Sequence, residues 1–271
     1  MLENLEIDLP SRERQDVIAL IFSSLQNKID LNIKLNDNLL NSLRSTVDDY
    51  FCYLPEDMPD GWKSCSLPDI ASIISGYSYK GEELVDNSND ALVTIKNFDR
   101  TGGFKIEGYK PLFISERVKQ TQLVELFDIV VAHTDLTQGA EIIGNSEIIL
   151  SKGGFDRLVA SMDLVKIQPN NTIGRFLLAA LLSNYQFKGH CLGYVNGTTV
   201  LHLSKDAVKE YSMAIPDDTS ILEKYNTYCE GIYRTIAHNM AEKERLIALR
   251  DYLLPKLMSG EIDVSTLEIP N

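Results

Sequence analysis

Apolar residues in the N-terminal part of the chain follow the period of an α-helix. They recur at Ile18, Phe22, Leu25 and Ile29, and again at Leu39, Leu43 and Val47. This spacing places apolar side chains on one helix face, and Ser11 after Pro10 is a suitable N-cap. The pattern predicts a helix from about Ser11 to about Cys52. A short strand precedes it, because apolar and polar residues alternate over Leu5–Leu9.

A helix of this length would extend for about 60 Å at a rise of 1.5 Å per residue. That is too long for a helix wrapped in the core of an ordinary domain. Two arrangements would explain it: a pair with another long helix, or a kinked helix on the surface. Pairing is the favoured interpretation.

A second long helical pattern begins after Pro216. Tyr225, Ile232, Asn239, Leu246 and Leu253 lie seven residues apart, which is the repeat of a coiled coil. A lone asparagine at such a seam position is typical of a residue that fixes the register of two helices. Pro255 would kink this helix or mark its last turn, and Gly260 suits a C-terminal cap.

The two ends of the chain resemble each other. "EIDLP" before the first helix matches "SMAIP" before the second, so that 206 residues separate Pro10 from Pro216. The same 206 residues separate Leu43-Arg44 from Leu249-Arg250. We interpret this as a diverged repeat of strand, proline and long helix, with one domain between the two copies.

The pattern changes between these helices. The stretch "LPEDMPDGW" is rich in proline and acidic residues and marks a domain boundary. Short strand-like runs then follow at Ala91–Ile95, Leu126–Ala132, Met162–Ile167 and Gly193–Leu203. Asn196-Gly197 is a hairpin turn signal, "RTGGF" (Arg100–Phe104) predicts another tight turn, and Ile173–Phe187 is the one clear helix. The region Trp62–Pro216 therefore predicts an α+β domain.

Net charge limits which partners this chain can bind. The 271 residues carry a formal charge of −13, with a pI of about 4.8, which argues against a protein that binds nucleic acid tightly and unaided. The charge is uneven, however, because basic residues outnumber acidic ones between Thr94 and Gln120. These basic residues are Lys96, Arg100, Lys105, Lys110, Arg117 and Lys119. Any anion-binding face must therefore be local.

No pattern in the sequence predicts catalysis, a metal or a cofactor. GxGxxG, P-loop, GxSxG, HExxH and EF-hand motifs are absent, and cysteines and histidines are scattered. Nothing pairs the candidate acids Asp69, Asp128, Asp135 and Asp163. The cysteine usage predicts reduced thiols in a cytoplasmic protein. No apolar run is long enough for a membrane span, and the N-terminus has no secretory signal pattern.

Four stretches resemble the specificity (S) subunits of type I restriction–modification enzymes. "LRDYLLPKLMSGEIDV" (Leu249–Val264) resembles the signature at the end of these subunits. Residues 9–43 resemble the central conserved helix of the family, and "LPEDMPDGWKSCSLPDIASIISGYSYKG" resembles the start of a target recognition domain. "GTTVLHLSKDAVKEYSMAIP" is similar to the strand and closing segment of such a domain. The stretches are spread from end to end, so together they are much more specific than any one.

The resemblance implies a fold and a division of the chain. The expected fold class is α+β, with one globular mixed domain and two long conserved helices packed as an antiparallel coiled coil. Residues 1–54 would form the central conserved region (a strand end and a long helix), 55–216 the target recognition domain, and 217–271 the distal helix and C-terminal tail. Full S subunits have two recognition domains and this chain has one, so it looks like a half-length form.

The resemblance also implies a function without catalysis. Each recognition domain of the family reads one half of a split double-stranded DNA target, while methyltransferase (M) and restriction (R) subunits supply the chemistry. This chain would then bind DNA, M and R subunits. It would also pair with a second copy, or with another S half, through its helices. One alternative remains open, namely a non-reading scaffold or decoy that only binds M subunits; an independent enzyme is a more distant one.

Candidate DNA-contacting residues lie on predicted loops, where polar side chains can reach phosphates or base edges. Each could equally be a packed, capping or turn residue. The predicted set is Tyr77, Ser78, Tyr79, Lys80, Lys96, Asn97, Arg100, Lys105, His133, Thr134, Thr137, Asn196, Thr198 and Thr199.

Overall fold

The computed structural model describes residues 10–100, 102–137, 139–170, 172–197, 200–204 and 206–264. The chain divides into two compact units, which are described separately. The helix unit consists of Met1–Leu39 with Ile236–Asn271, and the recognition unit is Leu40–Thr235. The strand predicted at Leu5–Leu9 lies outside the described residues.

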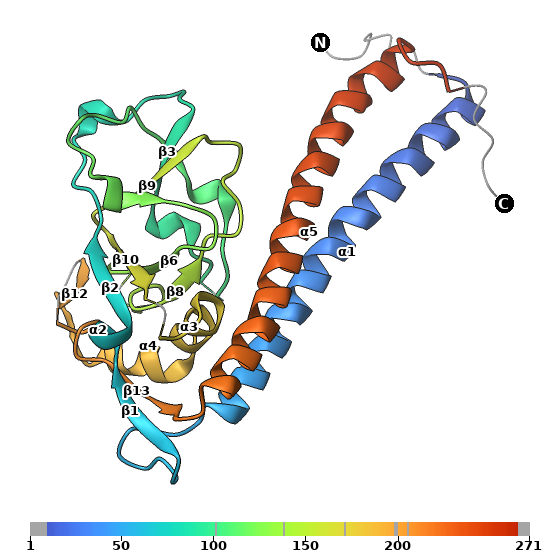
Figure 1. Cartoon of the computed structure of the whole chain (residues 1–271). Helices are drawn as coiled ribbons and strands as arrows, with labels where there is room; N and C mark the ends of the chain where they lie inside the picture. The colour runs from blue at the N-terminus through green and yellow to red at the C-terminus, as the bar shows by residue number, and fades with distance from the viewer. Residues whose placement is uncertain are drawn as a thin grey trace. The chain divides into compact units, whose positions relative to one another are not determined.

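Two long helices confirm the main prediction from the hydrophobic pattern. Helix α1 spans Arg12–Tyr50 and helix α5 spans Thr219–Ser259. Within the helix unit they lie side by side (Figure 1). The backbone N–H of Arg14 donates to Ser11 Oγ over 3.4 Å, as expected for a cap at this end. Pro255 lies inside α5 close to its end, and Gly260 follows the helix.

Side-chain pairs in the helix unit define an antiparallel arrangement. Asn32 Nδ2 donates to Glu242 Oε2 over 2.7 Å, and Arg250 donates to Gln26 Oε1 over 3.0 Å. Residue numbers therefore fall along α5 as they rise along α1. Near the termini of the pair, Ile18, Leu257 and Val264 form a buried apolar cluster.

The predicted seam asparagine does face the other helix. Asn239 is 7% exposed, and its Nδ2 donates to Asn36 Oδ1 over 2.8 Å. Asn32, which is 2% exposed, makes the second buried polar contact of the pair. A shift of one helix along the other would leave these amides without partners, and an unsatisfied buried amide is costly. The polar pairs therefore fix the register.

The recognition unit is built on small sheets. One sheet has the order β2-β10-β6-β8 and is antiparallel throughout. Its strands are β2 (Ala71–Ser75), β10 (Leu164–Pro169), β6 (Ile129–Ala132) and β8 (Ser146–Ile148). A second sheet has the order β4-β3-β9-β5, in which β3 and β9 are parallel. Its strands are β4 (Lys110–Pro111), β3 (Asp90–Val93), β9 (Arg157–Ala160) and β5 (Leu123–Val124).

Two shorter sheets complete the unit. The strand β12 (Leu201–Leu203) pairs with both β11 (Val195–Asn196) and β7 (Thr134–Asp135). The strand β1 (Trp62–Ser66) pairs antiparallel with β13 (Ser212–Pro216), so the two ends of the domain lie beside each other (Figure 1). Short helical segments are α2 (Leu67–Ile70), η1 (Gly81–Glu83), η2 (Ile95–Asn97), η3 (Ile106–Gly108) and η4 (Gln120–Gln122).

One helix prediction was wrong in its extent. The single helix predicted at Ile173–Phe187 is two helices, α3 (Arg175–Leu182) and α4 (Tyr185–Leu192). The side chain of Asn184 accepts from the backbone N–H of Phe187 over 3.0 Å and so starts the second helix. Asparagine favours this N-cap position over a helix interior, which explains the break.

The core of the recognition unit lies between its two larger sheets. Apolar residues of β3, β6, β9 and β10 form one buried cluster. From Phe176 to Leu182 every residue of α3 is buried. The C-terminal part of α1 joins this unit through Leu43 and Val47, which have no exposed surface. For this reason the compact unit is larger than the predicted target recognition domain, residues 55–216. The boundaries of that domain stay a prediction.

The burial of two leucines of α1 predicts how much each contributes to the free energy of unfolding. Leu43→Ala is expected to lower the free energy of unfolding by about 2–5 kcal/mol, because Leu43 is 0% exposed and the truncation leaves a cavity. Leu31→Ala, at a position 59% exposed, should cost less than about 1 kcal/mol. Denaturant unfolding followed by circular dichroism measures both. Equal losses in the two variants would contradict the burial of Leu43.

Candidate nucleic-acid interface

Several predicted residues gather around the turn that joins β9 to β10. We call this group, which consists of Ser78, Tyr79, Lys80, His133, Thr134, Met162 and Asp163, the Asp163 edge. The segment with Ser78, Tyr79 and Lys80 passes close to this turn because residue 76 is a glycine. A Cβ at Gly76 would lie 1.9 Å from the carbonyl oxygen of Ser161. The next residue, Tyr77, donates its backbone N–H to Ala160 over 2.7 Å.

The carboxylate of Asp163 connects this edge to the strand after β6. Thr134 Oγ1 donates to Asp163 Oδ1 over 3.0 Å, and the backbone N–H of His133 donates to the Asp163 carbonyl over 2.7 Å. Thr134 pairs in register with His202 of β12, which in turn pairs with Asn196 of β11. The structure thus brings the predicted residues at 78–80, 133–134 and 196 to neighbouring strands and turns.

A buried hydrogen-bond network holds the segment after β2. Tyr77 is 3% exposed, and its hydroxyl donates to Glu83 Oε1 over 2.6 Å. The backbone N–H of Lys80 donates to Glu83 Oε2 over 2.6 Å. The Tyr77 hydrogen bond, followed by those from Lys80 and Ser115, lowers the pKa of Glu83 to about 2. Glu83 therefore stays ionised at neutral pH and keeps Ser78, Tyr79 and Lys80 in place.

Two further predicted residues, Arg100 and Lys105, lie on a second loop. We call residues 99–100 with 102–105 the Arg100 loop. Phe98 and Phe104 form a β-bridge across it, and the Asp99 backbone N–H donates to the Gly103 carbonyl over 2.8 Å. Asn97 closes the preceding turn, because its side chain accepts from Thr94 and donates to the Lys105 carbonyl.

Both cations of the Arg100 loop have acidic neighbours. Lys105 lies 3.2 Å from Asp99, and Arg100 lies 3.3 Å from Glu141. Both pairs are well exposed to solvent, so each contributes little to stability. A DNA phosphate could replace the carboxylate at either position at small cost.

The loop after β7, of which residues 136–137 and 139–143 are described, is held by hydrogen bonds to Asp135 and from Lys188. Burial alone would raise the pKa of Asp135, but hydrogen bonds from Ile142 and Thr137 lower it. Lys188 of α4 donates to the carbonyl oxygens of Ala140 and Ile143 on the opposite side of the loop. The ionised carboxylate and the ammonium group together fix a loop that carries the predicted residue Thr137.

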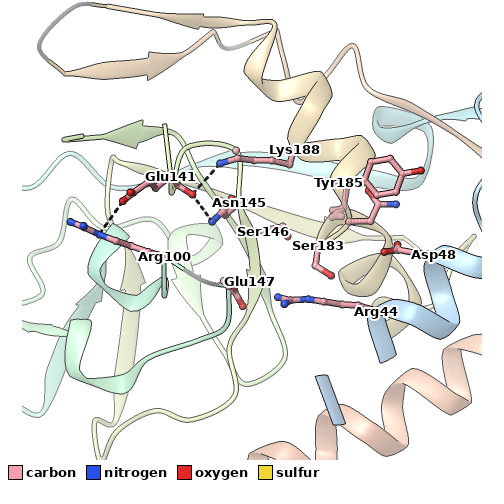
Figure 2. Close-up of a pocket in the computed structure, with 14 residues that line it drawn as sticks. Arg44, Asp48, Arg100, Glu141, Asn145, Ser146, Glu147, Ser183, Tyr185 and Lys188 are labelled. Atoms are coloured by element: carbon pink, nitrogen blue, oxygen red, sulfur yellow. Dashed lines mark hydrogen bonds and ion pairs between the residues drawn. The ribbon is translucent and has the colours of Figure 1, made fainter. Parts of the chain in front are cut away.

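A polar cavity of about 330 Å³ lies beneath these two loops (Figure 2). Figure 2 shows Arg44 of α1 and Glu147 of β8 facing each other across it. Glu147 is 8% exposed, and burial raises its pKa to about 7, although the Gly103 N–H and Arg44 act in the opposite direction. Around neutral pH this side chain therefore exists in both its acidic and its ionised form.

The predicted residues differ in how much of them can reach a ligand. Tyr77, Asn97 and Thr134 are buried and hydrogen-bonded to the protein, so their observed role is to hold loops. Thr198 and Thr199 lie outside the described residues. The half-buried residues are Tyr79, Lys105, His133 and Thr137, and the exposed ones are Ser78, Lys80, Lys96, Arg100 and Asn196. DNA contact stays a prediction for the whole set.

Sequence reasoning missed several residues in this region. Arg117 donates to the Ser78 carbonyl over 2.9 Å and lies over the Tyr77 ring. His202 is exposed between two buried leucines, an alternation that the sequence already contained. Nothing in the sequence could have indicated Glu147 and Arg44, because they are brought together only by the fold.

The described residues contain neither a cluster of metal-binding side chains nor a membrane-spanning helix. No group of three or more histidine, cysteine, aspartate or glutamate side chains is placed to hold a metal ion in the described ranges. Within the same part of the chain, none of the helices is long and apolar enough to cross a membrane.

The geometry defines a class of protein, a loop-bearing mixed α+β module inserted between two long helices. No family model matches the chain. The chain is, however, 25% identical to the type I restriction enzyme MjaIX specificity subunit of Methanocaldococcus jannaschii, over 98% of this chain and 62% of that protein. The resemblance predicted from the sequence is thereby confirmed, and the chain is similar to a type I specificity subunit over almost its whole length. It spans about three fifths of that relative's length.

Solved structures of two S subunits are also similar. The S subunit of the type I restriction–modification system from M. genitalium has a TM-score of 0.54 at 18% identity, over 94% of this chain and 62% of that one. This likeness supports the fold, with a mixed domain and long helices. The HsdS subunit from Thermoanaerobacter tengcongensis has a TM-score of 0.48 at 13% identity, over 93% and 58% of the two chains.

Glu147 is expected to make stability depend on pH. Its pKa is about 7 in the folded protein, against an ordinary value of 4.5, so the folded state binds more protons between these values. Its favourable contribution is therefore complete below about pH 4.5 and is lost as the pH rises through about 7. Glu147→Gln, which stays neutral, should match the wild type near pH 4 and exceed its free energy of unfolding by about 1–3 kcal/mol at pH 8.

Denaturant unfolding at several pH values measures this difference. Glu125→Gln is a matched control, because it removes the same charge from a side chain that is 65% exposed. The difference between this control and the wild type should not change with pH. A constant difference for Glu147→Gln over the same range would contradict the assignment.

Proposed function

We propose that this chain is a DNA sequence-specificity subunit of a type I restriction–modification system. Its recognition domain binds one half of a split double-stranded DNA target. The chain recruits M and R subunits, which supply methyl transfer and cleavage, and has no catalysis of its own. Since its partners act on DNA, we place it in the cytoplasm of its host.

The observation that carries this proposal is the sequence relationship. A specificity subunit matches 98% of the chain, including both long helices and the whole domain between them. The similarity therefore extends over the recognition domain. A scaffold that only binds M subunits would not need this domain, because it does not read DNA. This favours a reader over the non-reading alternative.

The loops of the recognition unit suit the two kinds of DNA contact. Exposed Lys80, Lys96 and Arg100 can neutralise phosphates, which positions a protein on the duplex. Asn196 and His133 carry groups that can hydrogen-bond base edges. The chain as a whole is acidic, at −13, so M subunits would supply much of the phosphate neutralisation.

The helix unit offers a surface for a second half. The repeat relates Leu43-Arg44 to Leu249-Arg250, and Leu43 is fully buried in the recognition unit, whereas Leu249 is 44% exposed. Tyr252, three residues further along α5 and on the same side of the helix, is exposed as well. We propose that this apolar face of α5 takes the recognition domain of a second copy, or of another S half. A two-fold pair of this kind would read a split palindromic target.

The complex with an M subunit should select one DNA sequence. We expect the full chain bound to a type I M subunit to enrich a single split sequence from a random duplex library. The affinity should fall steeply with salt, by about 10³-fold or more between 50 and 200 mM if six or more phosphates are contacted. The chain alone should bind weakly. Complex formation without sequence enrichment would instead support the scaffold, and equal affinity with and without M would contradict the shared neutralisation.

Light scattering coupled to gel filtration tests the pairing. The wild-type chain alone is expected to have twice the mass of one copy of S, and its complex with M subunit is expected to have a mass that includes two copies of S. Leu249→Asp combined with Tyr252→Asp should return the mass to that of a single S copy, because charges would enter the apolar face. Lys209→Asp, at an exposed position of the recognition unit, serves as the control and should leave the mass unchanged. A single-copy mass for the wild type under both conditions would exclude the homodimer.

A further inference from the structure

The Arg100 loop is attached to the rest of the recognition unit by its backbone. Its Gly103 N–H donates to Glu147 Oε1 over 2.7 Å, although the two residues are 44 positions apart in the chain. Since Glu147 is almost entirely buried, it cannot exchange this partner for water at no cost. The hydrogen bond therefore fixes the loop tip against β8.

Helix α1 supplies the second part of this attachment. Gly102 has a φ of +90°, and a Cβ there would lie 2.8 Å from a terminal guanidinium nitrogen of Arg44. Glycine adopts such a positive φ without strain, which explains why it occupies this position beside Arg44. Leu40 of the same helix also borders the loop, with its Cδ2 3.8 Å from the Cβ position of Gly103. The tip thus has Arg44 and Leu40 on one side and Glu147 on another.

With its backbone held in this way, the loop keeps its cations accessible. The Arg100 side chain is 64% exposed and that of Lys105 is 42% exposed. Arg100 also pairs with Glu141, whose loop is fixed by Asp135 and Lys188. The two candidate loops are therefore connected, and the buried hydrogen bond to Gly103 supports both.

We propose that Glu147 is a positioning residue for DNA binding, which holds the Arg100 loop in place together with Arg44. This proposal rests on the proposed function, because it assumes that Arg100 and Lys105 contact DNA phosphates. Glu147 itself touches no DNA. It acts through the Gly103 amide, by ordering the loop before binding, so that less conformational freedom is lost in the complex.

A set of variants of the full chain in complex with M subunit tests this role. Glu147→Ala removes the acceptor of the Gly103 N–H, whereas Glu147→Gln keeps an oxygen in its place. Arg100→Gln with Lys105→Gln removes the cations themselves. The selected duplex is titrated at several salt concentrations. Each phosphate contact adds about 0.9 to the slope of log affinity against log salt, so the double variant should lower the slope by about 2.

Glu147→Ala is expected to lower the slope by about 1 to 2 and the affinity about tenfold at 0.1 M salt. Glu147→Gln should restore wild-type values. In the double-variant background Glu147→Ala should have almost no further effect, because the cations that it positions are gone. Amide hydrogen exchange of the full chain without DNA should show faster exchange at Gly103 in Glu147→Ala only.

Each outcome separates this proposal from the function on which it rests. A wild-type complex that selects no sequence overturns the proposed function, and the DNA role of Glu147 with it. A selective complex in which Glu147→Ala leaves the slope unchanged overturns the positioning role alone. An additive effect in the double-variant background also overturns it, because loss of folded protein would act independently of the cations. The control Glu125→Gln, at a 65% exposed site, should behave as the wild type.

Discussion

The structure of the recognition unit depends on the pairing of β1 with β13. Trp62 lies opposite Pro216 and Ser66 opposite Ser212, so the strand that opens the domain is hydrogen-bonded to the strand that closes it. Aromatic rings reinforce this junction, with the centroids of Tyr50 and Tyr225 4.7 Å apart. The end of α1 and the start of α5 are thereby brought together. All loops between these two helices therefore belong to a domain that the chain enters and leaves at the same place.

Much of this architecture was already contained in the sequence. The three-and-four spacing from Ile18 to Val47 and the seven-residue spacing from Tyr225 to Leu253 gave the long helices, because a single apolar face dominates each pattern. The hairpin at Asn196-Gly197 was equally clear, with Val195 paired opposite Leu203. Strand ends were less accurate: β10 begins at Leu164 rather than Met162, since the turn before it is set by contacts with distant residues.

The candidate site was predictable only in part, for a physical reason. Loop positions such as Lys80 and Arg100 can be found from turn signals and charge, which are local properties. The groups that support those loops come from elsewhere in the chain, as Glu147 does for Gly103 and Glu83 does for Tyr77. The burial that raises the pKa of Glu147 to about 7 is likewise a property of the fold. Short-range patterns carry no information about such partners.

The β1–β13 ladder also bears on how such a protein can change over generations. Because both connections of the domain meet at this ladder, the whole segment between Trp62 and Pro216 is a cassette. A replacement segment would need only to keep the two short terminal strands in register, and the helices outside it could keep their sequences. Modest genetic exchange at two places could therefore give the same scaffold an entirely different set of loops.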